Sequence, residues 1–105
     1  REEQGLRVRA QNGRGHALYQ LGRYPESIQA YHTAITMDPA GVTGRALYNM
    51  GSSYAAVELY SDAIKCFEQA LDRGLDKDDV NICKTQINRC KLLHKEQEKR
   101  RRAAA

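Results

Sequence analysis

The chain has 105 residues and a formal net charge of +4, which suits one small domain with a modest core. It has two prolines, no tryptophan and a single phenylalanine, and helix-favouring residues are abundant, so the composition argues against a β-sandwich. No apolar run approaches the roughly 20 residues that a membrane span needs. Three cysteines without the dense spacing of a disulfide framework favour a reducing, intracellular compartment such as the cytoplasm.

The strongest pattern is an internal repeat, in which residues match others 36 positions further along the chain. Gly15 falls on Gly51, and Tyr24 falls on Tyr60. Other identical pairs are Arg9 with Arg45, Ala10 with Ala46, Ile28 with Ile64 and Ala34 with Ala70. Because the matches concentrate at small and apolar positions, they indicate stacked structural units.

Unit one, which we place at residues 8–39, has the pattern of a helical hairpin. Its first helix carries apolar residues at helical spacing around Gly15, and Pro25 suits the first turn of its second helix. Glycine inside a helix costs about 1 kcal/mol relative to alanine, so Gly15 predicts that another helix approaches closely. Pro39 ends the unit, because the residue before a proline is disfavoured in a helix.

Unit two, at residues 44–75, repeats this hairpin after a loop at 40–43. Gly51 takes the place of Gly15, and a turn near Glu58 separates the two helices. Ala63 is small where the paired helices are expected to cross, as Ser27 is in unit one. One face of the second helix is apolar and consists of Ile64, Phe67, Ala70 and Leu71.

Residues 77–100 are predicted to form a single capping helix. Asp78 and Asp79 place negative charge at its start, which suits the helix dipole. One face of it carries Val80, Cys83, Ile87, Cys90 and His94. We expect residues 101–105 to be a frayed tail. The fold class is therefore all-α, an α-solenoid of antiparallel hairpins that forms one domain over residues 1–100.

The order of these residues resembles the tetratricopeptide repeat. Unit two carries the family's markers at Leu47, Met50, Gly51, Tyr54, Ala63, Phe67 and Ala70. Unit one matches at Gly15, Leu18, Ser27, Tyr31, Ala34 and Pro39 but has Gln11 and Arg14 where the family has a large residue and leucine. The resemblance implies a right-handed stack of helices whose concave groove, lined by the first helices, holds a peptide segment of a partner protein.

Carried over position by position, the resemblance names eight candidate groove residues. They are Arg9, Asn12 and His16 in unit one, Arg45, Asn49 and Ser52 in unit two, and Lys84 and Asn88 in the last helix. Some relatives grip chaperone C-termini through a clamp of lysines, asparagines and an arginine. Asn49 matches that clamp, whereas Asn12 and His16 replace its lysine and asparagine.

Other chemical sites have weaker support. Cys83, Cys90 and His94 share a helical face, but one helix rarely closes a tetrahedral zinc site, so we predict core residues and no metal. Cys66 has no histidine at a telling spacing and no oxyanion site, so we predict neither catalysis nor a cofactor.

The sequence therefore predicts a non-catalytic protein-interaction module of the adaptor, scaffold or co-chaperone type. Two alternatives remain open. The short array suits a self-assembling module that forms homo-oligomers. The basic stretch from Lys91 to Arg102 suits contact with an anion or nucleic acid, although few aromatic side chains interleave with its charges and we do not expect base stacking.

Overall fold

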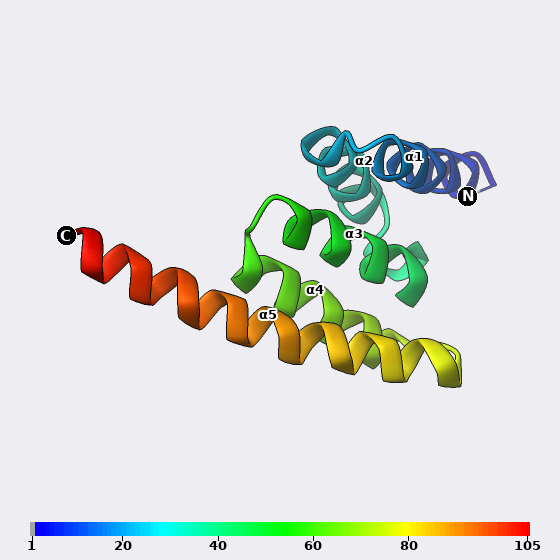
Figure 1. Cartoon of the computed structure of the whole chain (residues 1–105). Helices are drawn as coiled ribbons and strands as arrows, with labels where there is room; N and C mark the ends of the chain where they lie inside the picture. The colour runs from blue at the N-terminus through cyan, green and yellow to red at the C-terminus, as the bar shows by residue number, and fades with distance from the viewer. Residues whose placement is uncertain (1) are drawn as a thin grey trace.

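The computed structural model describes residues 2–105, and over this range it contains five α-helices and one short 3₁₀ turn (Figure 1). The helices are α1 (Glu2–Gln20), α2 (Tyr24–Met37), α3 (Gly44–Ala56), α4 (Tyr60–Arg73) and α5 (Lys77–Ala104), and the turn η1 spans Pro39–Gly41. α1 pairs with α2 and α3 pairs with α4, while α2 packs on α3 and α5 packs on α4. The predicted all-α stack of two hairpins and a final helix is confirmed.

Each hairpin is held by an aromatic ring that lies against a glycine. A Cβ atom added at Gly15 would lie 2.9 Å from ring atoms of Tyr31, and one added at Gly51 would lie 2.8 Å from the ring of Phe67. Both rings are fully buried. The predicted close approach is therefore confirmed, and it explains why a helix-weakening residue occupies both positions.

The two hairpin turns share one backbone conformation. Gly22 (φ +77°) and Glu58 (φ +64°) stand 36 residues apart, and both have positive φ angles. At each turn the next residue's N–H bonds a carbonyl five residues back, from Arg23 to Leu18 (2.9 Å) and from Leu59 to Tyr54 (2.9 Å). This is the Schellman arrangement that ends many helices, and its left-handed position favours glycine. Glu58 thus adopts a conformation that costs a non-glycine residue roughly 1–2 kcal/mol.

The core follows the packed faces of the helices. In α5 the buried residues are Cys83, Ile87 and Cys90, and Val80 and His94 are half-buried beside them, as the sequence predicts. The Cys83 thiol donates a hydrogen bond to the carbonyl oxygen of Phe67, with Sγ 3.3 Å away. No helix within residues 2–105 is both long and apolar enough to cross a membrane.

Three boundaries differ from the predictions. α1 begins at Glu2, six residues before the expected start of unit one. The expected loop at 40–43 overlaps η1, and Val42 is buried there with 2% of its surface exposed. The prediction of a frayed tail at residues 101–105 is wrong for its first four residues, because α5 continues to Ala104. Arginine and alanine are strong helix formers, so α5 persists as it projects beyond α4 (Figure 1).

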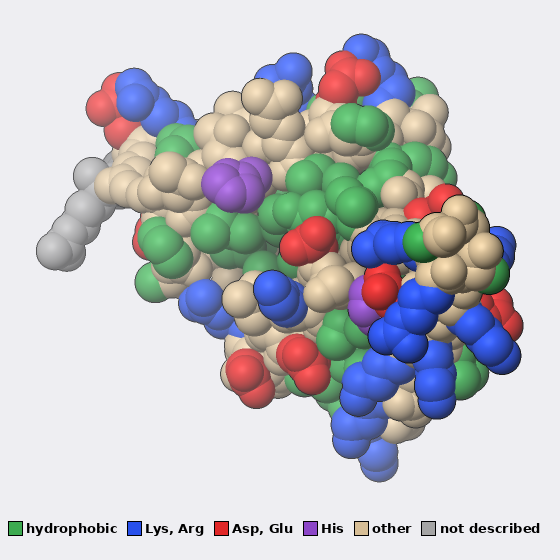
Figure 2. Space-filling model, turned by 90° about the vertical axis from the view of Figure 1, so that its left-hand side faces the viewer, with side chains coloured by type: hydrophobic (Ala, Val, Ile, Leu, Met, Phe, Trp, Pro, Cys, Tyr) green, Lys and Arg blue, Asp and Glu red, His purple; other side chains and the backbone are tan. Residues whose placement is uncertain are grey.

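Lysine and arginine side chains crowd over the end of the molecule from which α5 projects (Figure 2). α5 contains nine of the seventeen lysines and arginines but only four of the thirteen acidic residues. The positive charge of the chain is therefore concentrated on this one helix.

Candidate interaction groove

α5 packs mainly on α4, which leaves a groove between α5 and α3. Two polar contacts connect α5 to the second hairpin. Near the N-terminal ends of α3 and α5, Arg45 and Asp79 form an ion pair (3.4 Å). Further along α5, Nε2 of Gln97 donates a hydrogen bond to the carbonyl oxygen of Glu58, 3.1 Å away. Both contacts join α5 to the hairpin, and a hollow remains between α3 and α5.

This space is a hollow of about 300 Å³, reached by side chains from four helices. Its lining consists of Tyr19, Tyr48, Ser52, Ala55, Ala56, Tyr60, Gln86, Arg89, Cys90 and Leu93. Tyrosine rings and aliphatic side chains supply apolar surface, while hydroxyl, amide and guanidinium groups supply polar contacts. More of the lining surface is polar than apolar, so a ligand in this hollow would be held by hydrogen bonds as well as by contact with the tyrosine rings.

Tyr48 is the fixed aromatic side of the hollow. Its ring packs against the ring of Phe67, with 5.4 Å between centroids, and the Arg45 guanidinium carbon lies 5.3 Å from its centroid. Burial raises the pKa of Tyr48, and the neighbouring Ser52 side chain partly opposes the shift. The hydroxyl group therefore stays neutral at physiological pH and can both donate and accept hydrogen bonds.

Arg89 is the free cation of the hollow. It is exposed, and it takes part in none of the ion pairs formed among residues 3–105. Arg45, by contrast, divides its guanidinium group between Asp79 and the face of Tyr48. A carboxylate entering the hollow would therefore meet Arg89 without displacing an existing partner.

Of the eight predicted groove residues, Ser52 alone lines this hollow. Asn49 is 7% exposed, and its Nδ2 donates a hydrogen bond to Nδ1 of His16, 3.3 Å away. These two side chains join α3 to α1. Asn12 also lies in a partly buried position, with an Oδ1 atom that has no hydrogen-bond partner among the described residues, while Arg9 is exposed.

Lys84 and Asn88 lie on a different side of α5 from the hollow. Each is two residues from Gln86, which places it nearly opposite that side chain around the helix. Both are exposed. The structure thus brings Ser52 together with Gln86 and Arg89, and it separates Lys84 and Asn88 from them.

The sequence analysis missed Tyr19, Tyr48, Gln86, Arg89 and Leu93 as groove residues. A usable signal was present in α5, because Gln86, Arg89 and Leu93 follow helical spacing on a flank next to the face of Cys83 and Cys90. Which flank faces α3 depends on how α5 crosses α4. The ion pair of Arg45 with Asp79 shows which side of α5 lies near α3, and this contact exists only in the folded chain.

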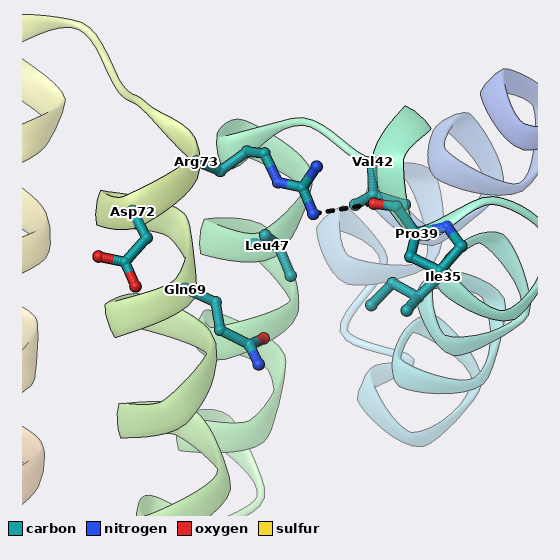
Figure 3. A pocket seen from close by; sticks show the side chains of 7 residues that line it. All are labelled: Ile35, Pro39, Val42, Leu47, Gln69, Asp72 and Arg73. Atoms are coloured by element: carbon teal, nitrogen blue, oxygen red, sulfur yellow. Dashed lines mark hydrogen bonds between the residues drawn. The ribbon is translucent and has the colours of Figure 1, made fainter.

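A second hollow, of about 400 Å³, lies between the second helices of the hairpins (Figure 3). Ile35, Pro39 and Val42 lie on one side of it, and Gln69 and Arg73 reach it from α4. Arg73 spans the hollow, since its Nη2 donates to the Pro39 carbonyl oxygen at 2.9 Å and its Nη1 donates to that of Ala40 at 3.3 Å. The guanidinium group therefore joins the two units and is less free to bind a ligand than Arg89.

The three cysteines are free and buried. Burial raises the pKa of the Cys66 thiol to about 12, with a further contribution from Asp62, and burial also raises the pKa values of Cys83 and Cys90. A thiol with a raised pKa is a poor nucleophile and a poor metal ligand. Among residues 3–105, no three His, Cys, Asp or Glu side chains gather closely enough to hold a metal ion.

Comparison with known families agrees with this geometry. The model of the tetratricopeptide repeat matches residues 6–76, which include the second hairpin and all of the first except the start of α1. This chain belongs to the tetratricopeptide-repeat family. Tetratricopeptide repeats generally mediate protein–protein interaction, and the family is typically non-catalytic. A comparison with curated proteins gives no match.

Proposed function

We propose that this tetratricopeptide-repeat chain is a non-catalytic module that holds a segment of a partner protein in the groove between α3 and α5. The hollow lined by Tyr48, Ser52, Arg89 and Leu93 is the observation that supports this proposal, together with the lack of an ion-pair partner for Arg89 among the described residues. Tyrosine offers a large contact area for little loss of conformational entropy, which makes it effective in binding sites. The partner segment would place a side chain that can form hydrogen bonds in the hollow and a carboxylate near Arg89.

The adaptor or scaffold type fits these residues better than the co-chaperone type. A clamp for chaperone C-termini needs its asparagine free to bind the ligand. Asn49 is buried and bonded to His16, so it would have to leave an existing hydrogen bond. The buried thiols, with their raised pKa values, support a non-catalytic role and suit a reducing intracellular compartment.

The test is selection from a displayed peptide library, followed by calorimetric titration of the selected peptides against three proteins. These are the unaltered chain, Ser52→Trp, which fills the hollow, and Thr33→Trp, which adds the same bulk to an exposed position of α2. We expect Ser52→Trp to weaken binding at least about tenfold, or 1.4 kcal/mol, and Thr33→Trp to leave it unchanged. Equal affinity for all three proteins would place the binding site elsewhere.

A second candidate function, self-association, is favoured by the outer face of α1. Four exposed positions of α1, and Leu21 directly after it, stand 36 residues before positions that are mostly buried in unit two. The exposed residues are Leu6, Ala10, Gly13, Ala17 and Leu21. Their counterparts are Val42, Ala46, Asn49 and Ser53, which are buried, and Val57, which is half-buried. The interface that joins the two units therefore has an uncovered equivalent on unit one.

We infer that a second copy of the chain covers this face at high concentration. Leu6 and Leu21 are 59% and 71% exposed, and with the small residues between them they form a continuous exposed row. Sedimentation velocity over a range of concentrations should show a monomer–dimer equilibrium that Ala10→Glu and Ala17→Glu together abolish. A monomer at every concentration would exclude self-association through α1.

A further inference from the structure

α5 carries a row of cations on the side that points away from the groove. The row consists of Lys84, Lys91, Lys95, Lys99 and Arg102, with Asn88 between the first two. Successive members are three or four residues apart, so they lie along one side of the helix for about 27 Å. All six are exposed. We call this row the basic flank.

The basic flank has no acidic partner among the described residues. None of its cations takes part in the ion pairs found within residues 3–105. Glu98, which stands next to the row, is paired with Arg101 at 3.1 Å. Like charges four residues apart destabilise a helix, and Lys91, Lys95 and Lys99 form two such pairs in succession. The positive charges of the row are therefore free to meet an anionic partner.

The basic flank also contains apolar surface. Leu92 is 67% exposed, and it lies beside the lysine side chains, whose aliphatic stems are apolar. These groups border a shallow hollow of about 780 Å³ along this side of α5. Its lining consists of Lys91, Leu92, His94, Lys95, Glu96, Glu98, Lys99 and Arg102. A matching ligand would thus present carboxylates around an apolar side chain.

These properties fit a protein helix better than other anions. No phenylalanine, tyrosine or tryptophan occurs in α5, so bases of a nucleic acid would find no ring to stack on. A phosphate backbone would leave Leu92 without an apolar contact. An anionic membrane surface would need a broader apolar face, which a single exposed leucine does not provide. A second copy of α5 would bring further positive charge to the flank.

We propose that the basic flank binds an acidic amphipathic helix of a partner protein. The helix lies along α5, with carboxylates opposite Lys91, Lys95 and Lys99 and an apolar side chain over Leu92. This site goes beyond the proposed groove function, because Gln86 and Arg89 face the groove from another side of the same helix. α5 therefore contributes to two proposed binding surfaces, and mutations can test each surface separately.

The test measures binding to a synthetic helical peptide of about 20 residues, with glutamates in one row and leucines beside it. A scrambled peptide of the same composition, an RNA duplex and phosphatidylserine-containing vesicles are the comparison probes. The main variant combines Lys91→Glu, Lys95→Glu and Lys99→Glu. A second variant combines Lys91→Gln, Lys95→Gln and Lys99→Gln, which removes the three positive charges without adding negative ones. The matched control combines Arg7→Glu, Arg14→Glu and Lys65→Glu, which changes net charge equally at exposed positions elsewhere.

The amphipathic peptide should bind more tightly than the scrambled one, and added salt should weaken its binding. Both flank variants should weaken binding at least about tenfold, whereas the matched control should change it less than about twofold. Leu92→Ala should weaken peptide binding, and Ser52→Trp should leave it unaltered even if the groove proposal fails. Equal binding of the scrambled peptide, tighter binding of the duplex or vesicles, or equal loss in the matched control would overturn the proposal.

Discussion

Replacing Gly51 with alanine tests whether the two helices of unit two approach as closely as the structure shows. The new Cβ would lie 2.8 Å from two ring atoms of Phe67 and 3.2 Å from the Ala63 carbonyl oxygen. Phe67 is fully buried, so its ring has little room to move. Overpacking of this kind costs about 1–3 kcal/mol, whereas replacing a helical glycine with alanine gains about 1 kcal/mol. We expect a net loss of up to about 2 kcal/mol.

Gly13→Ala is the matched control, because Gly13 also lies inside a helix but a Cβ there would meet nothing within 4 Å. It should stabilise the chain by about 0.5–1 kcal/mol. Urea unfolding followed by circular dichroism would show the two variants shifting stability in opposite directions, with a difference of up to about 3 kcal/mol. If Gly51→Ala stabilised the chain as much as Gly13→Ala, the ring of Phe67 could not lie against α3, and the hairpin packing described above would be wrong.

Three further predictions concern single side chains. Glu58→Gly should raise the free energy of unfolding by about 0.5–1 kcal/mol, because it relieves a left-handed backbone, and Glu58→Ala should not. Tyr31→Phe should leave thermal stability unchanged or raise it by up to about 1 kcal/mol, since the buried hydroxyl has no hydrogen-bond partner among the described residues and Phe67 fills the equivalent place in unit two. Folding raises the pKa of Cys66 from 9.0 to about 12, so its stabilising contribution is complete below pH 9.0 and is lost as the pH rises toward 12. Unfolding midpoints measured across this range should therefore fall more steeply for the unaltered chain than for Cys66→Ala.

The hairpins were predictable from the sequence because each depends on local residues repeated at a fixed interval. Gly15 and Gly51 marked the helix crossings, and Pro25 and Pro39 marked helix boundaries that the structure reproduces. The buried face of α5 was predictable for the same reason, since Cys83, Ile87 and Cys90 follow helical spacing. Propensity at single positions was a weaker guide, as shown by Glu58, which adopts a conformation usually left to glycine.

The groove was less predictable because it depends on where α5 lies relative to α3. Ile87 stands 36 residues after Gly51, so α5 lacks the small residue that sets the helix approach in both hairpins. The position of α5 is instead determined by contacts far apart in sequence, such as that of Gln97 with Glu58. Asn49 illustrates the same limit. The sequence predicted that the amide group of Asn49 binds a ligand. In the structure, packing between α1 and α3 buries this amide against His16.

The central claim, that a partner segment occupies the groove between α3 and α5, is tested most directly by nuclear magnetic resonance. Backbone amide shifts of the labelled chain would be recorded during titration with a peptide selected from the displayed library. The proposed function predicts the largest shift changes around Tyr48, Ser52, Gln86 and Arg89, with little change around the hollow spanned by Arg73. Shift changes confined to Gln69, Arg73 and their neighbours, with the groove unaffected, would contradict it.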